Sequence, residues 1–327
     1  MGGQALKNAN TERKSKEQFI NIYCKVVQKL IEEMNIHPID IRMIDYYRDK
    51  SDFGDMDLII SKEYKNDTFL DRLKQVFNPI EVYPNTDVYS FDFEKFQIDL
   101  IFIPREYLQI ATTYYNYNDL GNLMGRIADK LGVRYGHTGL KFEHYVLNRS
   151  AKLATIKLSI DPRQIFEFLG YDFDRYLLGF QNIEEMFEYV VTSKYFNPKY
   201  FEYSNLNHQN RTRNKKRKTY EQFLEWLKNT KYSYVYEPTA EKNLQKIFET
   251  FPFVKSEIER VEKELRKKDI IGNKFNGNLI KNLIPDINFK RISNIIIEFN
   301  KLYDEAYIEK QKQSVINDKI LEINARL

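Results

Sequence analysis

The fold is decided by the stretch Ser51-Asp52-Phe53-Gly54-Asp55-Met56-Asp57-Leu58-Ile59-Ile60. About forty residues later, Phe96-Gln97-Ile98-Asp99-Leu100-Ile101-Phe102-Ile103-Pro104 again sets an aspartate just before apolar residues. Side chains alternate between the two faces of a β-strand, so Asp55 and Asp57 are expected on one face. Asp99, on a neighbouring strand, can converge with them.

Three clustered carboxylates repel one another, and oxygen-rich sites of this kind hold Mg²⁺ or Mn²⁺ against substrate phosphates. We therefore predict that Asp55, Asp57 and Asp99 are catalytic and bind two metal ions. One ion would be shared with a triphosphate, and the other would lower the pKa of an attacking hydroxyl. The alternative is that Gly-Asp-x-Asp marks only a strand-end turn, since short motifs match by chance. The second stretch, which leads into Pro104 and Tyr107, favours the metal site.

These stretches resemble the catalytic palm of the DNA polymerase beta, or X-family, nucleotidyltransferases. Residues 114–126 then resemble the nucleotide-pocket helix of that family, and residues 158–170 are similar to a segment near its C-terminus. The matches run in the family's order over roughly residues 16 to 175, and such ordered matches are more specific than one motif. The resemblance implies metal-dependent addition of nucleoside monophosphates to the 3′-hydroxyl of a nucleic acid, with release of pyrophosphate.

The resemblance also implies roles for individual residues. Asp99 would be the metal ligand nearest the primer hydroxyl. The implied nucleotide-binding residues are Arg48 at the triphosphate, Gly54 before the acids, Tyr114 beside the sugar, Asp119 against the base and Asn122 on its minor-groove edge. Arg126 would point toward the template strand. For Tyr114, ordinary aromatic packing is an equally good interpretation.

Two positions depart from the family pattern. Ile44-Asp45 stands where the family has a Gly-Ser turn that holds the nucleotide phosphates, and Asn116-Tyr117 stands where it often has Thr-Gly. Isoleucine keeps the backbone farther from a ligand than glycine does, and a carboxylate beside a polyphosphate is unfavourable unless a cation offsets it. We therefore expect altered nucleotide binding and base selection.

The charge distribution indicates a nucleic-acid partner more clearly than the net charge of +4 does. No acidic residue lies between Glu202 and Glu221. The interval contains a basic run, namely Arg211, Arg213, Lys215, Lys216, Arg217 and Lys218. Such a run binds phosphate backbones in a salt-sensitive way. The alternative is a solvated loop, but beside a polymerase-like palm we favour contact with DNA or RNA.

Composition is typical of a globular protein of 327 residues with room for two domains. No apolar run approaches the ~18 residues of a membrane span, and the N-terminus lacks the apolar core of a signal peptide. The single cysteine, Cys24, excludes an internal disulfide. We expect a cytoplasmic protein, or one of the host cytoplasm if it is viral; the abundance of Asn, Lys, Ile and Tyr hints at an AT-rich viral or phage genome.

The expected fold class is α+β, with a polymerase beta-type palm of mixed sheet and helices followed by a mainly helical C-terminal domain. The expected segments are a flexible tail (1–14), the palm (15–110), a nucleotide-pocket and thumb-like region (111–200), a basic loop (201–218) and a helical domain (219–327). Ser15 with Gln18 predicts a capping box, and Asp161-Pro162 predicts a helix start. Only about fifteen residues precede the first predicted helix, so an upstream domain for a 5′-phosphate is not expected.

Three other functions stay open. The helical C-terminal region favours untemplated addition to RNA 3′ ends, as in CCA- and poly(A)-adding enzymes. Transfer of a nucleotide to a protein or small molecule is a second alternative, against which the basic run argues. The third is a nucleic-acid-binding protein with a decayed site, motivated by Ile44-Asp45. Retention of all three acids argues against decay, because clustered charge without metal is destabilising.

Overall fold

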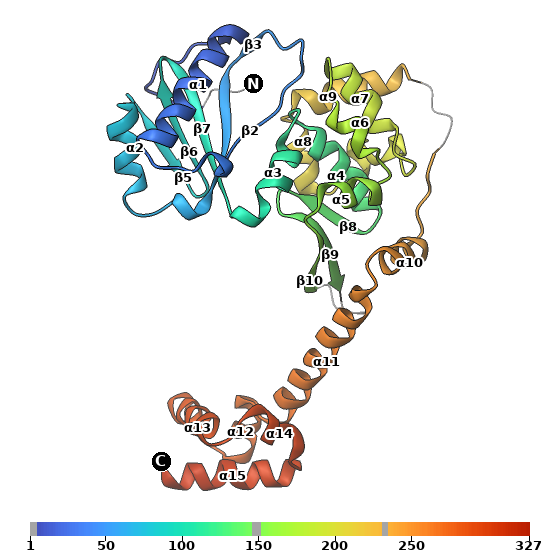
Figure 1. Ribbon diagram of the computed structural model, residues 1–327. Coiled ribbons are helices and arrows are strands. Elements are labelled where there is room, and N and C mark those ends of the chain that lie inside the picture. The colour runs from blue at the N-terminus through green and yellow to red at the C-terminus, as the bar shows by residue number, and fades with distance from the viewer. Residues whose placement is uncertain (1–4, 146–151, 231–234) are drawn as a thin grey trace. The chain divides into compact units, whose positions relative to one another are not determined.

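The computed structural model describes residues 5–145, 152–230 and 235–327, in two compact units, Met1–Phe251 and Pro252–Leu327. The first unit combines sheets and helices and the second is helical (Figure 1), which confirms the α+β class. The division lies later in the chain than the expected boundary at 219, because α9 (Lys218–Lys228) belongs to the first unit. Its buried Phe223 packs against Phe187 and Phe201 of that unit.

A mixed five-stranded sheet forms the N-terminal part of the first unit, in the order β2-β4-β7-β6-β5. Its strands are β2 (Ile41–Met43), β4 (Asp55–Ser61), β5 (Val82–Asn85), β6 (Val88–Phe93) and β7 (Phe96–Ile103). The central strands β4 and β7 are parallel, and the other pairs are antiparallel. Parallel strands are buried on both faces, which explains the continuous apolar runs Leu58–Ile60 and Leu100–Ile103.

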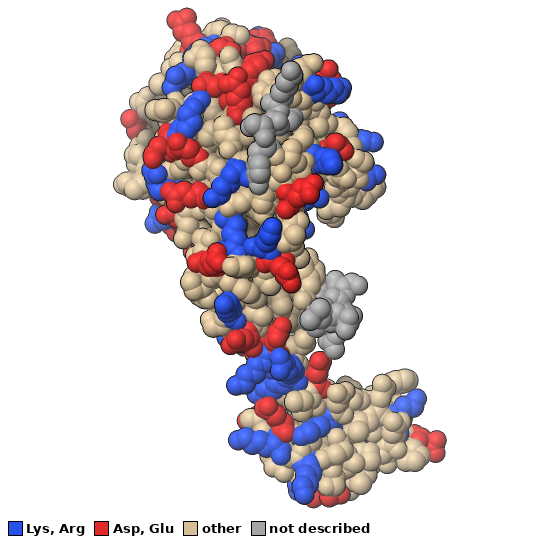
Figure 2. All heavy atoms as spheres, turned by 90° about the vertical axis from the view of Figure 1, so that its right-hand side faces the viewer, with Lys and Arg blue, Asp and Glu red and all other residues tan. Residues whose placement is uncertain are grey.

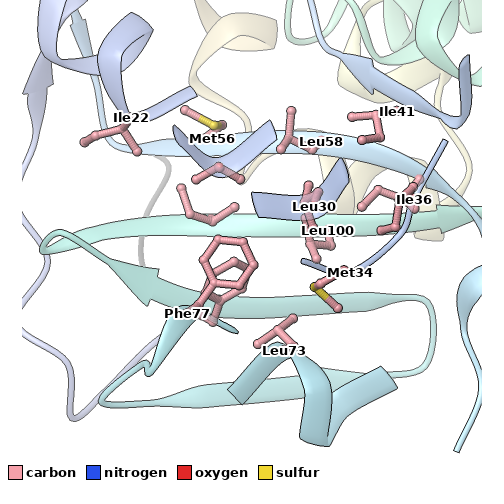
Figure 3. Packing of buried hydrophobic residues seen from close by; sticks show 14 of the residues in the cluster. Ile22, Leu30, Met34, Ile36, Ile41, Met56, Leu58, Leu73, Phe77 and Leu100 are labelled. Atoms are coloured by element: carbon pink, nitrogen blue, oxygen red, sulfur yellow. The ribbon is translucent and has the colours of Figure 1, made fainter. Parts of the chain in front are cut away.

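The two faces of this sheet have different neighbours. Met56, Leu58 and Leu100 face a core that they share with α1 (Lys16–Glu32) and α2 (Phe69–Phe77), as Figure 3 shows. The predicted capping box of Ser15 and Gln18 opens α1. The alternate residue Ile59 packs on the opposite face with α3 (Leu108–Tyr115). Because side chains alternate along a strand, Asp55 and Asp57 share the α3 face with Ile59.

The rest of the first unit surrounds a smaller antiparallel sheet in the order β10-β9-β8. Its strands are β8 (Val133–Gly136), β9 (Gly139–Tyr145) and β10 (Lys152–Ser159). The helices of this region are α4 (Leu120–Lys130), α5 (Pro162–Phe168), α6 (Phe173–Leu177), α7 (Ile183–Val191), α8 (His208–Asn214) and α10 (Ala240–Thr250). Asp161 caps α5 with Pro162 in its first turn, as predicted. Short 3₁₀ turns are η1 (Pro38–Asp40), η2 (Lys62–Tyr64), η3 (Arg105–Tyr107), η4 (Pro198–Tyr200) and η5 (Tyr203–Asn205).

The N-terminal segment is held in place, in contrast to the expected flexible tail over 1–14, whose first four residues lie outside the described part. Leu6 and Ala9 are buried. The Glu81 carboxylate accepts hydrogen bonds from the backbone N–H groups of Lys7, Asn8 and Ala9. β1 (Lys14–Ser15) then pairs with β3 (Asp52–Phe53). An acceptor far along the chain therefore orders a segment that is polar in sequence.

The second unit has its own core. It comprises α11 (Phe253–Lys274), α12 (Gly277–Leu283), α13 (Phe289–Leu302), α14 (Glu305–Lys310) and α15 (Gln313–Arg326). Ile280, Ile295, Phe299, Ile316 and Ile320 are fully buried together. A separate core of this kind is what defines a domain.

The surface mixes charges of both signs. On the face shown in Figure 2, acidic and basic side chains are interspersed, in keeping with the small net charge of +4. Among the described residues, no helix has both the length and the apolar character that crossing a bilayer requires.

Candidate active site

The three predicted catalytic carboxylates lie on one face of two adjacent parallel strands. Asp57 of β4 is in register with Asp99 of β7, and Asp55 is in register with Gln97. All three carboxylates are half-buried. The two strands therefore bring together the acids of two stretches that lie forty residues apart in sequence, on the face opposite α1 and α2.

The electrostatics of these acids reflect their proximity. Burial, and then repulsion by Asp55 and Asp99, raises the pKa of Asp57 to about 8, although the nearby Lys50 ammonium opposes the shift. Burial also raises the pKa of Asp99, with repulsion from Asp55 adding to it and hydrogen bonds from Ser90 and Gln97 opposing it. Like charges in a partly desolvated site disfavour ionisation, and a bound cation would relieve that cost.

The carboxylate oxygens suit a hard divalent cation, but they do not form a complete set of metal ligands. Within the described residues, no group of three or more His, Cys, Asp or Glu side chains is gathered closely enough to hold a metal ion. Gln97 Nε2 donates to both carboxylate oxygens of Asp99, each at 3.0 Å. A cation at this face would therefore compete with Gln97 for Asp99.

Two cations accompany the acids. Lys50 lies over the Phe53 ring at 4.5 Å, and burial lowers its pKa while Asp55 and Asp57 oppose the shift. Arg13 pairs with Asp52 and is close enough to Asp55 for that carboxylate to raise the pKa of its guanidinium. Arg13 was not a predicted site residue, because it lies in a segment that has no regular pattern.

Of the two residues assigned to the triphosphate, Gly54 adjoins Asp55, whereas Arg48 contacts the segment that follows α6. Arg48 is exposed, and its guanidinium donates to the Leu178 carbonyl while its backbone N–H donates to the Phe180 carbonyl at 3.1 Å. Gly54 lies in the bend between β3 and β4, directly before Asp55. Arg48 therefore ties the segment before β3 to the end of α6.

The predicted nucleotide-pocket helix is α4 together with the end of α3. Tyr114 packs edge-on against Tyr115 and Tyr135, with ring centroids 5.4 and 5.2 Å apart, so its aromatic packing interpretation holds in this structure. Asp119 and Asn122 are buried. The Asp119 carboxylate pairs with Arg217, and Asn122 Nδ2 donates to Asn214 Oδ1 at 3.0 Å.

The basic run divides between solvent and this helix. The expected loop over 201–218 contains η5 and α8, because Asn207 caps a short helix by accepting from the Asn210 N–H. Arg211, Arg213, Lys215, Lys216 and Lys218 are exposed, whereas Arg217 turns inward to Asp119. Arg126 is buried on α4 and pairs with Asp129 at 3.1 Å.

Sequence reasoning missed two residues that contact the predicted site, Asn214 beside Asn122 and Gln97 beside Asp99. Neither belongs to a motif, although Gln97 shares a strand face with Asp99.

Among known proteins, the chain is similar to solved structures but to no family model and no curated protein. Among solved structures, it is similar to Leishmania infantum polymerase beta in a ternary P/T complex, with 14% identity and a TM-score of 0.34 over 42% of this chain. A ternary gap complex of the same polymerase gives 13% identity and a TM-score of 0.33 over 41% of this chain. The chain spans 60% and 52% of those two neighbours.

Proposed function

We propose that this protein is a metal-dependent nucleotidyltransferase that adds nucleoside monophosphates to the 3′-hydroxyl of a nucleic acid. The observation that supports this most is the placement of Asp55, Asp57 and Asp99 on one face of the parallel pair β4 and β7, with Asp57 opposite Asp99. Burial and repulsion between these acids raise the pKa of Asp57 and Asp99, and carboxylates on one strand face are the donor set of divalent-cation phosphoryl transfer.

In the proposed reaction, the 3′-oxygen attacks the α-phosphorus of a nucleoside triphosphate. A new phosphodiester bond forms as the bond to the β-phosphate bridging oxygen breaks, and pyrophosphate leaves. Asp55 and Asp57 would hold the Mg²⁺ or Mn²⁺ bound to the triphosphate, and such ions stabilise charge that develops on the phosphoryl oxygens. The Asp99 carboxylate would orient the hydroxyl and accept its proton.

The surroundings of the acids are compatible with polyanionic substrates. Arg48 is exposed in the segment before β3, and Lys50, in the same segment, lies near Asp55 and Asp57. The exposed basic residues of α8 and the start of α9 would contact the phosphate backbone of DNA or RNA. The roles of Tyr114, Asp119 and Asn122 toward a nucleotide remain proposals, and the last two would have to exchange Arg217 and Asn214 for the base.

An incorporation assay tests this proposal. The full chain is incubated with Mg²⁺ or Mn²⁺, labelled ribo- or deoxyribonucleotides, and DNA or RNA primers with and without template. We expect primer extension that EDTA abolishes and that Asp99→Asn lowers by about a thousandfold or more. The control is Asp71→Asn, an exposed aspartate of α2, which should retain full activity.

The arms of the assay separate the alternatives. Extension that needs a template supports a polymerase, whereas equal extension of RNA ends without one supports a terminal RNA nucleotidyltransferase. Absence of incorporation in every combination would contradict the proposal and favour a nucleic-acid-binding protein with a decayed site.

A further inference from the structure

We infer that the end of α4 and the connection from η4 to α8 form a binding pocket for one phosphate group of a nucleic-acid backbone, separate from the carboxylates. The pocket encloses about 220 Å³. Its charged lining comes from Arg126, Asp129, Lys130 and Arg134, and its opposite wall from Tyr200 and residues 205–207 and 210. The inference rests on the proposed function for the identity of the ligand.

The charge balance of the pocket favours an anion. Three cationic side chains line it against the single carboxylate of Asp129. That carboxylate is shared between two guanidinium groups, at 3.1 Å from Arg126 and 2.5 Å from Arg134, and Arg134 also pairs with Glu143 at 3.2 Å. Lys130 makes no ion pair among the described residues, and its ammonium lies 5.7 Å from the centre of the Tyr200 ring. Lys130 is therefore the cation of the pocket whose charge a bound anion would stabilise most.

A buried donor belongs to the wall of the pocket. Arg126 is only 8% exposed, and within the described part of the chain its Nε has no hydrogen-bond partner. A buried polar group of this kind costs free energy unless something outside the chain satisfies it. Because Arg126 lines the pocket, a phosphate bound there would stabilise its guanidinium charge while the Asp129 contact is kept.

The ligand that fits best is a backbone phosphate. The pocket is lined by guanidinium, ammonium and side-chain amide groups, and these donors suit the several oxygens of a phosphate. Asn207 and Asn210 of the pocket wall lie at the start of α8. The same helix carries the exposed Arg211 and Arg213. A strand with one phosphate in the pocket would therefore continue along a basic surface, as sequence-independent binding requires.

Binding of a base-free deoxyribose-phosphate oligomer tests the pocket. Affinity is measured by fluorescence anisotropy in EDTA over a series of salt concentrations, so that neither divalent cation nor catalysis contributes. The rim variants Lys130→Gln and Arg134→Gln each remove one charge and keep the buried Arg126 itself. We expect each to weaken binding about fivefold and to reduce the slope of log K against log salt by about 0.7.

The matched control is Lys74→Gln, which removes an exposed lysine of α2, the helix that packs on the five-stranded sheet. This change should leave the oligomer affinity and the salt slope unchanged. If the rim variants bind as the control does, the pocket is not a backbone site. A second arm follows thermal unfolding with about 20 mM inorganic phosphate at matched ionic strength. Two results together would overturn the backbone assignment in favour of free phosphate. Inorganic phosphate would raise the Tm of the native chain but not that of Lys130→Gln, and Lys130→Gln would bind the oligomer as tightly as the native chain does.

The test separates this pocket from the proposed function. Weakened oligomer binding by the rim variants in EDTA, without any nucleotide incorporation by the native chain, would support the pocket and contradict nucleotidyl transfer. If the rim variants incorporate nucleotide and bind the oligomer as the native chain does, the result would support nucleotidyl transfer and contradict the pocket.

Discussion

Asp45 and Asn116 are joined by two reciprocal hydrogen bonds. The Asp45 backbone N–H donates to Asn116 Oδ1 at 2.8 Å, and Asn116 Nδ2 donates to Asp45 Oδ2 at 2.8 Å. The two residues stand at the two positions where the sequence departs from the pattern that it resembles, and the structure joins them. Burial raises the pKa of Asp45, and the Asn116 hydrogen bond opposes that shift. The Asp45 carboxylate is therefore hydrogen-bonded to the residue that caps the end of α3.

A double-mutant cycle on this pair should show strong coupling. Asp45→Ala and Asn116→Ala each break the side-chain bond, and Asn116→Ala also strands the Asp45 N–H. We expect a coupling free energy of about 1 kcal/mol from urea unfolding. Additivity within about 0.3 kcal/mol would show that the two residues are independent.

The stability of the metal-free protein should depend on pH through Asp57. In the folded state its pKa is raised to about 8, so folding retains a proton that the unfolded chain releases near pH 4. The folded state therefore binds more protons in this window, and its stability falls as pH rises from about 5 to 8. We expect Asp57→Asn to remove that loss and to be the more stable protein at pH 8 by about 1 kcal/mol.

Thermal and urea unfolding in EDTA, over that pH range, measure this effect. Asp71→Asn on the exposed side of α2 serves as the control and should follow the native chain. Added Mg²⁺ should raise the Tm of the native chain and leave that of Asp57→Asn unchanged, because a ligand stabilises only the state that binds it. Parallel pH profiles for the native chain and Asp57→Asn would rule out the raised pKa.

Breaking the ion pair between Asp119 and Arg217 should strongly destabilise the folded state. Asp119 is only 6% exposed, so Arg217→Gln would leave a buried carboxylate without its cation. We expect a loss of about 3 kcal/mol in the free energy of unfolding. The neighbouring Lys218 is exposed, and Lys218→Gln removes the same charge at a cost below about 0.5 kcal/mol. Equal effects of the two changes would contradict the assignment.

Two glycines of α4 should respond oppositely to alanine. A Cβ at Gly121 would lie 2.3 Å from the Tyr114 carbonyl oxygen and 2.7 Å from its ring, whereas at Gly125 the nearest atom would be 3.9 Å away. Gly121→Ala should therefore destabilise by about 2 kcal/mol or more. Gly125→Ala should stabilise by up to about 1 kcal/mol, because alanine favours a helix. Chemical unfolding of both variants decides it; a stable Gly121→Ala protein would show that α3 and α4 can separate.

Features of this protein that depend on local chemistry could be predicted from its sequence. The period of two in a strand placed Asp55 and Asp57 on one face, and the capping residues Ser15 and Asp161 marked helix starts that the structure contains. These features depend on neighbours a few residues apart, which is why a single sequence predicts them. The α+β class was implied by the resemblance to the polymerase beta palm, and the structure has it.

Tertiary structure alone decided which groups each site residue contacts. Gln97 holds Asp99 and accepts from the Ala5 N–H, 92 residues away in sequence. Arg217 reaches Asp119 across 98 residues. Polar side chains in a partly buried site bind whichever donor or acceptor the packing brings near, and no periodicity along the chain encodes that choice. The sequence therefore placed the acids on their strand face, and the fold chose their partners.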